Sequence, residues 1–315
     1  MANCLSCHRP LGKQSGGYHA ACAMRLFGSK VVPELAYATA DLERVAAEWM
    51  ATHATLTGVQ PKLSLHWQGK DGPPRLTIVG ALEGQYILKA PYAKYPHMPG
   101  LEALCMNMAL ACGMPTVPFG LIALQDGALC YITRRIDRDG DRKVAMEDFC
   151  QLSGRLTEDK YKGSHEQVAK LIQAHSKQPL LDLVRYFEQV LFSFLIGNSD
   201  MHLKNFSLHA PTAGSHQLAP AYDLVSSQLL VPEDQEDLAL TLNGRKRKLD
   251  RDDFDAAMNG VIPGKARDNL FARIQEGMGQ WPALIAGSFI PGNMQARLNE
   301  LIANKAQRVG MTFDH

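Results

Sequence analysis

Apolar residues follow two different patterns along the chain. Between residues 54 and 136, short runs rich in β-branched and aromatic residues are separated by Gly, Pro and Asp, and this pattern predicts strands. The runs are KLSLHW, RLTIVG, QYILKAP, GLIAL and LCYITRRI. From residue 145 onward apolar residues recur at helical spacing, most clearly over 180–197. A β-rich first half followed by a helical second half predicts an α+β fold with two lobes.

Other stretches add helices to this outline. Residues 34–50 carry apolar side chains at helical spacing, which predicts an amphipathic helix. Residues 99–113 form a second helical pattern inside the β-rich half, closed by Gly113 and followed by Pro115. Two more helical patterns cover residues 251–260 and 293–310.

These patterns divide the chain into three regions. Residues 1–29 are short, Gly-rich and contain three of the seven cysteines. We expect residues 30–136 to form the β-rich lobe and residues 137–315 to form the helical lobe.

Composition narrows the class of protein. The 33 Lys and Arg residues balance 32 Asp and Glu residues, so general nucleic-acid coating by a basic surface is excluded. No apolar run reaches the roughly 18 residues of a membrane span, and the first residues lack the pattern of a signal peptide. An odd number of cysteines argues against a disulfide framework. We therefore predict a cytoplasmic protein with no membrane contact.

The segment after the longest apolar helix, LIGNSDMHLKNFS, is the most informative. It leaves the helix at Gly197 and places Asp200, His202, Lys204 and Asn205 within six residues. An Asp followed five residues later by an Asn is typical of phosphoryl transfer, where the Asp accepts the proton of the attacking hydroxyl and the Asn binds Mg²⁺. Lys204 can add positive charge near the transferred group. The alternative is a polar loop that caps the helix with Asx turns.

A second acid follows at a suitable distance. Asp223 is the single acid in the mostly apolar run APAYDLVS, 18 residues after Asn205. A second metal-binding acid belongs at about this place if a short strand and a turn separate it from the catalytic loop.

The β-rich half contributes a cation and an acid. Lys89 ends the run QYILK, and Glu102 lies thirteen residues later, near the start of the helix in that half. A strand Lys that binds ATP phosphates and is held by a helix carboxylate is an ion pair that kinases need. Taken singly, Lys89 can be an exposed strand-end lysine and Glu102 an acid placed at the positive end of a helix dipole.

The segment TLTGVQPKLSL precedes Lys89 and can lie over phosphates. It offers hydroxyl groups at Thr55 and Thr57 and backbone N–H groups around Gly58. It has one glycine and so is not a G-x-G-x-x-G loop, and a plain β-turn is the alternative.

Seven ordered blocks together resemble the HipA-like serine/threonine kinases, the kinase toxins of bacterial toxin–antitoxin modules, including their shorter HipT type. The blocks are TLTGVQPKLSL, YILKAP, LEALCMNMALACG, ITRRIDR, EDFCQLSG, IGNSDMHLKNFS and APAYDLVSS, and the resemblance runs from about residue 55 to about residue 250.

The resemblance implies a two-lobed kinase-like fold that uses ATP and Mg²⁺. It implies that Asp200 is the catalytic base, assisted by Lys204, and that Asn205 and Asp223 are the metal ligands. The residues implied on the nucleotide side are Lys89, Glu102, Thr57, Gly58, Thr133, Arg134, Ile136 and His202. Among these, the backbone from Thr133 to Ile136 is expected to meet adenine, and His202 to order the loop beside Asp200.

The resemblance also implies partners and regulation. Its protein substrates belong to translation, such as an aminoacyl-tRNA synthetase, and its inhibitor is a small DNA-binding antitoxin of the HipB type. A phosphate-loop serine of the family is autophosphorylated, and Thr55 and Thr57 occupy the corresponding positions here.

The N-terminal cysteines have the spacing of a structural zinc site. Cys4 and Cys7 form one pair, and His19 and Cys22 form a second pair after eleven intervening residues. Thiolate and imidazole groups are ligands that suit Zn²⁺. The alternative is a set of unligated surface thiols.

Two other functions remain open at this stage. The same core residues would serve a kinase-fold enzyme that phosphorylates a small molecule, and a non-catalytic binding module of an antitoxin complex is the second alternative. Residues 245–248, RKRK, are expected to form a solvated turn face, so direct nucleic-acid binding is not predicted.

Overall fold

The computed structural model describes residues 2–12, 16–52, 62–69, 73–80, 83–140 and 142–314. The chain divides into two compact units, and each is built from several segments of sequence. The first unit comprises residues 1–104, 117–140 and 287–290, and the second comprises residues 105–116, 141–286 and 291–315. Within the described part of the chain, no helix has both the length and the apolar character needed to cross a membrane.

The first unit is organised around an antiparallel sheet with the strand order β2-β1-β3-β5-β4. Its strands are β1 (Lys62–Gln68), β2 (Arg75–Val79), β3 (Tyr86–Lys89), β4 (Phe119–Ala123) and β5 (Leu129–Arg134). Each of the five apolar runs expected to form a strand does so. The two-residue strands β6 (Arg138–Asp139) and β7 (Arg142–Lys143) follow β5 in the chain.

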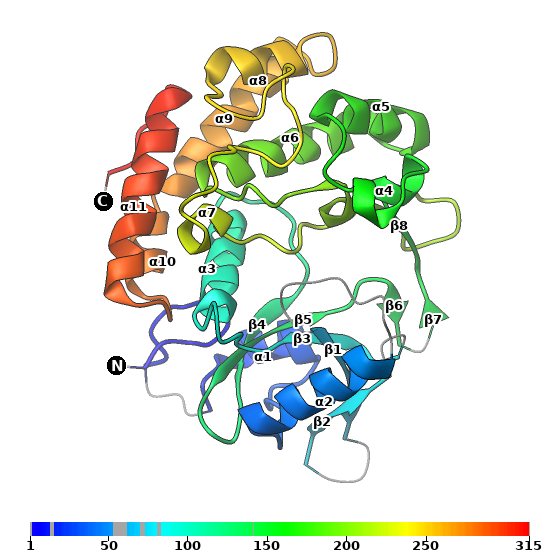
Figure 1. Cartoon of the computed structure of the whole chain (residues 1–315), viewed down its shortest axis with the longest axis vertical. Coiled ribbons are helices and arrows are strands. Elements are labelled where there is room, and N and C mark those ends of the chain that lie inside the picture. Colours follow the sequence, from blue (N-terminus) through cyan, green and yellow to red (C-terminus); the bar gives the residue numbers. More distant parts are fainter. Residues whose placement is uncertain are drawn as a thin grey trace. The chain divides into compact units, whose positions relative to one another are not determined.

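The two faces of this sheet carry different side chains, because successive residues of a strand point to opposite sides. One face carries Leu63, Leu65, Leu88 and Ile132, which are fully buried or nearly so in an apolar core. Helix α1 (Ala20–Phe27) and helix α2 (Thr39–Thr52) contribute to that core, and Figure 1 shows α2 lying across β1 and β2. Lys89 lies on the opposite face, beside its cross-strand neighbour Tyr131.

Helix α2 begins later than its apolar pattern predicted. The pattern indicated a helix from residue 34, whereas Glu34 forms a bridge with Arg75 in extended backbone and α2 starts at Thr39. The start is fixed by side chains that accept the first backbone N–H groups: Asp41 accepts from Ala38, and Asp126 accepts from Thr39. The apolar residues before Thr39 contribute to the core from an extended segment.

The second unit is mainly helical. Its helices are α4 (Phe149–Leu152), α5 (His165–His175), α6 (Pro179–Leu195), α7 (Ser227–Leu230), α8 (Arg251–Met258), α9 (Gly264–Met278), α10 (Trp281–Ala286) and α11 (Gly292–Arg308), with 3₁₀ turns η1 (Thr157–Asp159) and η2 (Leu203–Asn205). Helix α6 is buried along almost all of its second half and packs against α5, α9 and α11, as Figure 1 shows. The patterns over 180–197, 251–260 and 293–310 are confirmed as α6, α8 and α11.

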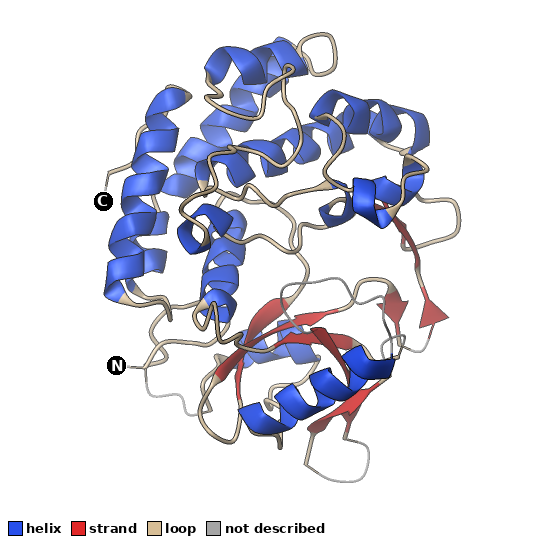
Figure 2. Ribbon diagram, viewed as in Figure 1, coloured by secondary structure: helices blue, strands red, loops and turns tan. Residues whose placement is uncertain are grey.

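A short sheet was not predicted in this helical unit. Strands β8 (Ala145–Asp148), β9 (Ser207–Ala210) and β10 (Gln217–Leu218) pair in the antiparallel order β10-β9-β8. Figure 2 shows that most of the ribbon of this unit is helix and loop. They span two to four residues each, too few for an alternating pattern to be recognised in the sequence. The metal-binding role predicted for Asp223 required a short strand and a turn after Asn205, and the structure has the two strands β9 and β10 there.

Helix α3 (Met98–Ala111) confirms the helix expected over 99–113. It also lies where the two units differ from the expected lobes, residues 30–136 and 137–315. The division between the units falls inside α3, so residues 105–116 belong to the second unit. Residues 287–290 belong to the first unit, although they come late in the chain. The expected regions were continuous stretches of sequence, whereas packing groups these segments with distant parts of the chain.

Candidate active site

Lys89 and Glu102 form a buried ion pair in the first unit. The Lys89 Nζ lies 2.6 Å from Glu102 Oε1, and their side chains are 7% and 3% exposed. Strand β3 presents Lys89, and the first half of α3 presents Glu102. Two charges removed from water to this extent are stable only when they are paired and hydrogen bonded. Neither residue is therefore the exposed surface group that each could be if taken alone.

Tyr131 is a further neighbour of Lys89 that the sequence did not reveal. It lies opposite Lys89 on β5, and the Lys89 Nζ is 5.3 Å from the centre of its ring. The face of an aromatic ring attracts a cation and so holds the ammonium group in place. The strand pairing could have revealed this neighbour, but a single sequence does not give the register.

The segment expected to meet adenine lies at the end of β5. The Thr133 hydroxyl and the Arg134 backbone N–H both donate to the Pro118 carbonyl, at 2.9 Å each. The backbone N–H of Arg135 donates to the Gln85 carbonyl at 2.8 Å. Ile136 follows β5 and is partly buried. These bonds fix the path of the segment and use two of its backbone donors within the unit.

The three phosphate-loop residues predicted from the sequence, Thr55, Thr57 and Gly58, lie outside the described residues.

In the second unit, the loop after α6 presents Asp200. The chain turns at Gly197 with φ of +67°, a conformation that favours glycine, and an added Cβ would lie 2.9 Å from a Leu301 methyl group. Asp200 is exposed, and its Oδ1 accepts a hydrogen bond of 2.5 Å from the Tyr161 hydroxyl. Tyr161 was not predicted from the sequence. It orients one carboxylate oxygen and leaves Oδ2 as the other acceptor of the group.

His202 follows Asp200 by two residues in the sequence, and its side chain is buried. Its ring meets the Tyr161 ring edge-on at 5.0 Å between centres, and its backbone N–H donates to the Asp200 carbonyl at 2.8 Å. Burial lowers the pKa of His202, which favours a neutral imidazole near pH 7. A neutral, packed ring fits the ordering role predicted for this residue.

Asn205 presents its amide oxygen because its amide nitrogen is already engaged. Nδ2 donates to the Asp200 carbonyl at 3.2 Å, so the oxygen is the atom that can ligate a cation. The next residue, Phe206, anchors this position by packing edge-on against Tyr186 at 4.9 Å. A hydrogen bond from the Asn205 side chain to the Asp200 backbone thus holds these two residues close together.

Lys204 has a partner that the sequence did not reveal. Its Nζ lies 2.9 Å from Asp148 Oδ2, at the end of β8. Asp148 also caps α4 through a capping box with Gln151. The pair ties Lys204 to the junction of β8 and α4. The Asp148 carboxylate therefore partly neutralises the positive charge that Lys204 can offer to a phosphoryl group.

Asp223 adopts a left-handed backbone conformation. Its φ is +59°, which is uncommon outside glycine and costs conformational energy. The preceding Tyr222 is held by hydrogen bonds to the Ser207 hydroxyl (2.5 Å) and the Lys204 carbonyl (3.2 Å). These bonds connect the Asp223 segment to the loop that carries Asn205. Such outliers cluster at functional sites, which fits the metal-binding role predicted for Asp223.

The N-terminal cysteines and histidine also come together. The ligand atoms of Cys4, Cys7, His19 and Cys22 all lie within 4.8 Å of one another. Hydrogen bonding, from Cys22 first and then from Cys7, lowers the pKa of Cys4 well below its usual range. The pKa of Cys22 is raised, first by its hydrogen bond to Cys4. Although its hydrogen bond with Cys22 would lower it, the hydrogen bond with Cys4 and burial raise the pKa of Cys7. Cys4 is therefore the thiol of this cluster that most favours the thiolate, which is the form that binds a metal cation.

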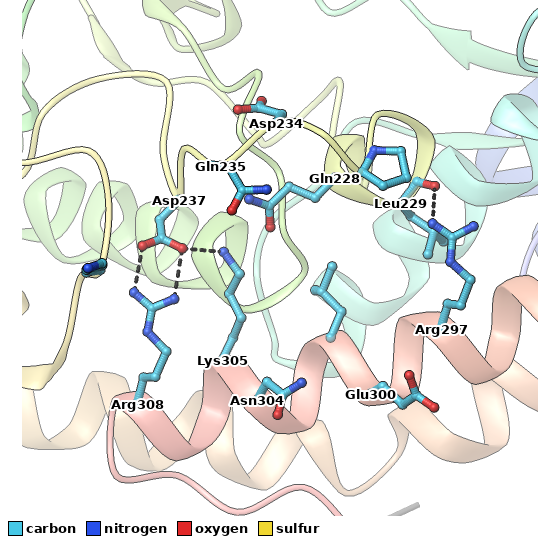
Figure 3. Close-up of a pocket in the computed structure, with 13 residues that line it drawn as sticks. Gln228, Leu229, Asp234, Gln235, Asp237, Arg297, Glu300, Asn304, Lys305 and Arg308 are labelled. Carbon is cyan, nitrogen blue, oxygen red and sulfur yellow. Dashed lines mark hydrogen bonds and ion pairs between the residues drawn. The ribbon is translucent and has the colours of Figure 1, made fainter.

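The second unit also contains a cavity of about 490 Å³ beside α11 (Figure 3). Arg308 and Lys305 reach Asp237 across it, at 2.6 and 2.7 Å, and Arg297 donates to the Leu229 carbonyl. Although burial alone would raise it, these two cations lower the pKa of Asp237 to about 2. The residues that line the cavity include none of the predicted catalytic or metal-binding residues.

Comparison with protein families identifies the fold. A family model described as the HipA-like C-terminal domain matches residues 54–282, which is most of the chain. The chain belongs to this family. The predicted resemblance is therefore confirmed.

Two curated relatives illustrate the similarity. The putative kinase Y4dM of Sinorhizobium fredii is 31% identical over 217 residues, covering 64% of this chain and 52% of that protein. The serine/threonine-protein kinase toxin HipA of Shewanella oneidensis is 28% identical over 210 residues, covering 60% and 46%. The chain spans about half the length of the curated relatives it matches.

Solved structures show the same fold at lower identity. HipA of Shewanella oneidensis, determined with HipB and operator DNA, superposes with a TM-score of 0.67 at 23% identity, covering 82% of this chain and 65% of that one. The proinflammatory kinase CtkA of Helicobacter pylori superposes with a TM-score of 0.54 at 15% identity, covering 78% and 93%. The mixed helix and strand architecture is thus one that these kinases share.

Proposed function

We propose that the chain is an ATP- and Mg²⁺-dependent protein serine/threonine kinase, the toxin of a HipA-type toxin–antitoxin module. The observation that carries the proposal is the buried Lys89–Glu102 pair at 2.6 Å. A buried ion pair contributes little net stability, because the loss of hydration offsets the attraction between the charges. A fixed ammonium group on a strand, held by a helix carboxylate, is what phosphate binding in a kinase requires.

The proposed metal ligands fit a hard cation. Asn205 offers an amide oxygen, and Asp223 offers a carboxylate from a strained backbone position. Oxygen ligands of this kind are those that Mg²⁺ prefers. The cation, when bound with ATP, would neutralise phosphate charge, and Lys89 is the residue proposed to bind phosphate oxygens.

Asp200 is the proposed catalytic base. Tyr161 occupies Oδ1 and fixes the plane of the carboxylate, so Oδ2 is the oxygen that accepts the proton of a serine or threonine hydroxyl. Lys204, restrained by Asp148, adds positive charge to the same loop. The work of the protein is then positioning and electrostatic stabilisation.

Membership of the family supports a proposal for the domains and the partners. We assign the β-rich first unit to the nucleotide lobe and the helical second unit to the substrate lobe, with residues 1–29 as an added N-terminal segment. We further propose an aminoacyl-tRNA synthetase or another translation protein as the substrate, a HipB-type antitoxin as the inhibitor, and autophosphorylation at Thr55 or Thr57.

The deciding experiment is transfer of labelled phosphate from ATP. Wild-type protein incubated with Mg²⁺-ATP and a cell lysate should label discrete proteins, whereas Asp200→Ala should label none while still binding ATP. Asp268→Ala is the matched control, since the Asp268 side chain is 77% exposed in the same unit. Label found only on a small molecule would mean that the substrate is a small molecule and not a protein. Unchanged ATP turnover in Asp200→Ala would contradict the role of Asp200 as the catalytic base.

A further inference from the structure

The cluster of Cys4, Cys7, His19 and Cys22 is built from two turns that face each other. Cys4 and Cys7 lie in a tight turn closed by the hydrogen bonds Cys4 N–Arg9 O (2.8 Å) and His8 N–Cys4 O (2.9 Å). His19 is the residue before α1, and Cys22 lies in the first turn of that helix. All four ligand atoms lie within 4.8 Å of one another.

The distances approach those of a tetrahedral metal site. Metal–ligand bonds of about 2.0–2.3 Å place neighbouring ligand atoms about 3.3–3.8 Å apart. His19 Nδ1 lies 3.3 Å from Cys7 Sγ and 4.0 Å from Cys22 Sγ. Small shifts of the side chains are enough to close the set around one ion.

His19 is held in the tautomer that a metal requires. Its Nε2 lies 3.1 Å from the Pro10 carbonyl, which can only accept a hydrogen bond, so Nε2 carries the proton. Nδ1 then has a lone pair, and it is Nδ1 that faces Cys7 and Cys22. A histidine ligand whose other nitrogen donates to a backbone carbonyl is the usual arrangement in metal sites.

The backbone supports the thiolates as well. The His19 backbone N–H lies 3.4 Å from Cys4 Sγ and donates to it. Cys4 is fully buried, whereas the other three ligands are partly exposed, so a metal could enter from the solvent side.

The same segment is attached to the end strand of the first unit's sheet. Leu121 of β4 donates its backbone N–H to the Leu5 carbonyl at 2.8 Å, and the Tyr18 hydroxyl donates to the Leu121 carbonyl at 2.5 Å. Gly120 allows this approach, because an added Cβ would overlap the Tyr18 hydroxyl. Leu5 lies between Cys4 and Cys7 in the sequence, and Tyr18 comes directly before His19. The residues next to the cluster therefore cover the outer edge of β4, which would otherwise be open.

We propose that Cys4, Cys7, His19 and Cys22 bind one structural Zn²⁺ ion, which fastens the N-terminal segment to strand β4. Three thiolates and one imidazole are a donor set that selects Zn²⁺ and fill all four positions of a tetrahedron, so the site is structural rather than catalytic. The proposal is independent of the proposed kinase activity.

Metal content tests the site directly. Elemental analysis of the full chain, purified without an added metal-binding tag, should find about one Zn per chain, and Co²⁺ exchanged into the protein should give the visible absorption of a tetrahedral thiolate site. Cys7→Ser and His19→Ala should each lower the Zn content severalfold, whereas His19→Cys should retain it. Cys130→Ala is the control, since Cys130 is a buried cysteine of the same unit outside the cluster.

Hydrogen exchange tests the attachment to β4. Removal of zinc by a chelator should speed exchange of the Leu121 amide, while the Leu124 amide, which donates to Ala128 within the β4–β5 turn, should keep its protection. Folded wild-type protein with no zinc and with the three thiols freely reactive would overturn the site, even if the variants failed to fold. Zinc loss that left Leu121 protected would overturn the fastening role.

Discussion

At the scale of single residues, the contact between Tyr161 and Asp200 is the most direct prediction about chemistry. A hydrogen bond to a charged group is worth about 1.5–3 kcal/mol, so Tyr161→Phe should lower kcat by roughly tenfold or more. The ATP KM should change little, because Tyr161→Phe keeps the ring that packs against His202 and removes only the hydroxyl that contacts Asp200. Steady-state kinetics would show this, with Tyr92→Phe as a control at an exposed tyrosine. An equal change in both variants would argue against orientation of Asp200 by Tyr161.

The Lys89–Glu102 pair allows its structural and functional roles to be separated. Lys89→Met removes the cation that neutralises the buried Glu102 carboxylate, and we expect the free energy of unfolding to fall by about 3–5 kcal/mol. The double variant Lys89→Met/Glu102→Leu removes both charges and should recover most of this stability, because buried pairs can often be replaced by apolar groups. It should remain inactive, since the phosphate-binding cation is still missing. Denaturant unfolding measures the stability of each variant, and transfer of labelled phosphate measures its activity. A double variant that regained activity would refute the role of Lys89.

Spacing in the sequence was enough to bring attention to two of the contacts at this scale, while the roles of their residues stay predictions. The pairing of Asp200 with Asn205 depends on residues close in sequence, and the Lys89–Glu102 pair follows from one strand and the next helix. Tyr161, Tyr131 and Asp148 could not be found in this way. Each reaches its partner through strand register or loop packing over 39 to 56 residues, and neither is visible in a single sequence.

At the scale of elements, the contact of α9 with the end of α3 predicts an unusual glycine effect. Alanine normally stabilises a helix by about 1 kcal/mol relative to glycine. At Gly277, however, an added Cβ would lie 2.5 Å from the Cys112 Cα, a backbone atom that cannot turn away. We expect Gly277→Ala to lower the free energy of unfolding by about 1–3 kcal/mol through overpacking.

The matched control for Gly277 is Gly292, at the start of α11. An added Cβ there meets no atom within 4 Å, so Gly292→Ala should be neutral or slightly stabilising. Denaturant unfolding of both variants measures the difference. If Gly277→Ala were as stable as Gly292→Ala, the close approach of α9 to Cys112 would be wrong.

Elements with a long, regular pattern could be predicted, and those set by single contacts could not. The apolar periodicity of α6 and α11 extends over several turns, and the five strands of the first unit are bounded by Gly, Pro and Asp. The start of α2 depends on Asp126, a residue from a distant turn, and β8–β10 are too short to show a pattern. Helix α1 was missed because its segment was interpreted from its cysteines alone.

At the scale of the whole molecule, the sequence predicted two parts but not the segments that compose them. Residues 287–290 lie in the first unit, where the Gly287 carbonyl accepts a hydrogen bond from the Asn3 side chain at 2.8 Å. A contact between residues 284 positions apart has no local signature in the sequence. Contacts of this kind, and the buried groups that they surround, are identified only by the structure.

His165 is such a group, and it predicts how the stability of the molecule depends on pH. It is fully buried, and burial lowers its pKa to about 3, whereas an unfolded histidine has a pKa of about 6.5. Below pH 6.5 the unfolded chain binds a proton that the folded chain does not, so stability is lost as the pH falls from about 6.5 toward 3. For this one group the loss between pH 7.5 and 5.5 is about 1.4 kcal/mol.

Replacement of His165 isolates this contribution. His165→Gln keeps a polar partner for the Tyr186 hydroxyl, which lies 2.7 Å from His165 Nδ1, but it cannot titrate. Between pH 7.5 and 5.5 the free energy of unfolding of the variant should therefore fall by about 1.4 kcal/mol less than that of the wild type, as measured by denaturant unfolding. His175→Gln, at the exposed end of the same helix, is the matched variant that makes the same exchange and leaves His165 in place. Asp237 does not interfere, because its lowered pKa of about 2 confines its own loss of stability to pH values below about 4. Equal losses in wild type and His165→Gln would mean that folded His165 takes up a proton over the same pH range as an unfolded histidine, which would contradict a buried histidine that stays neutral.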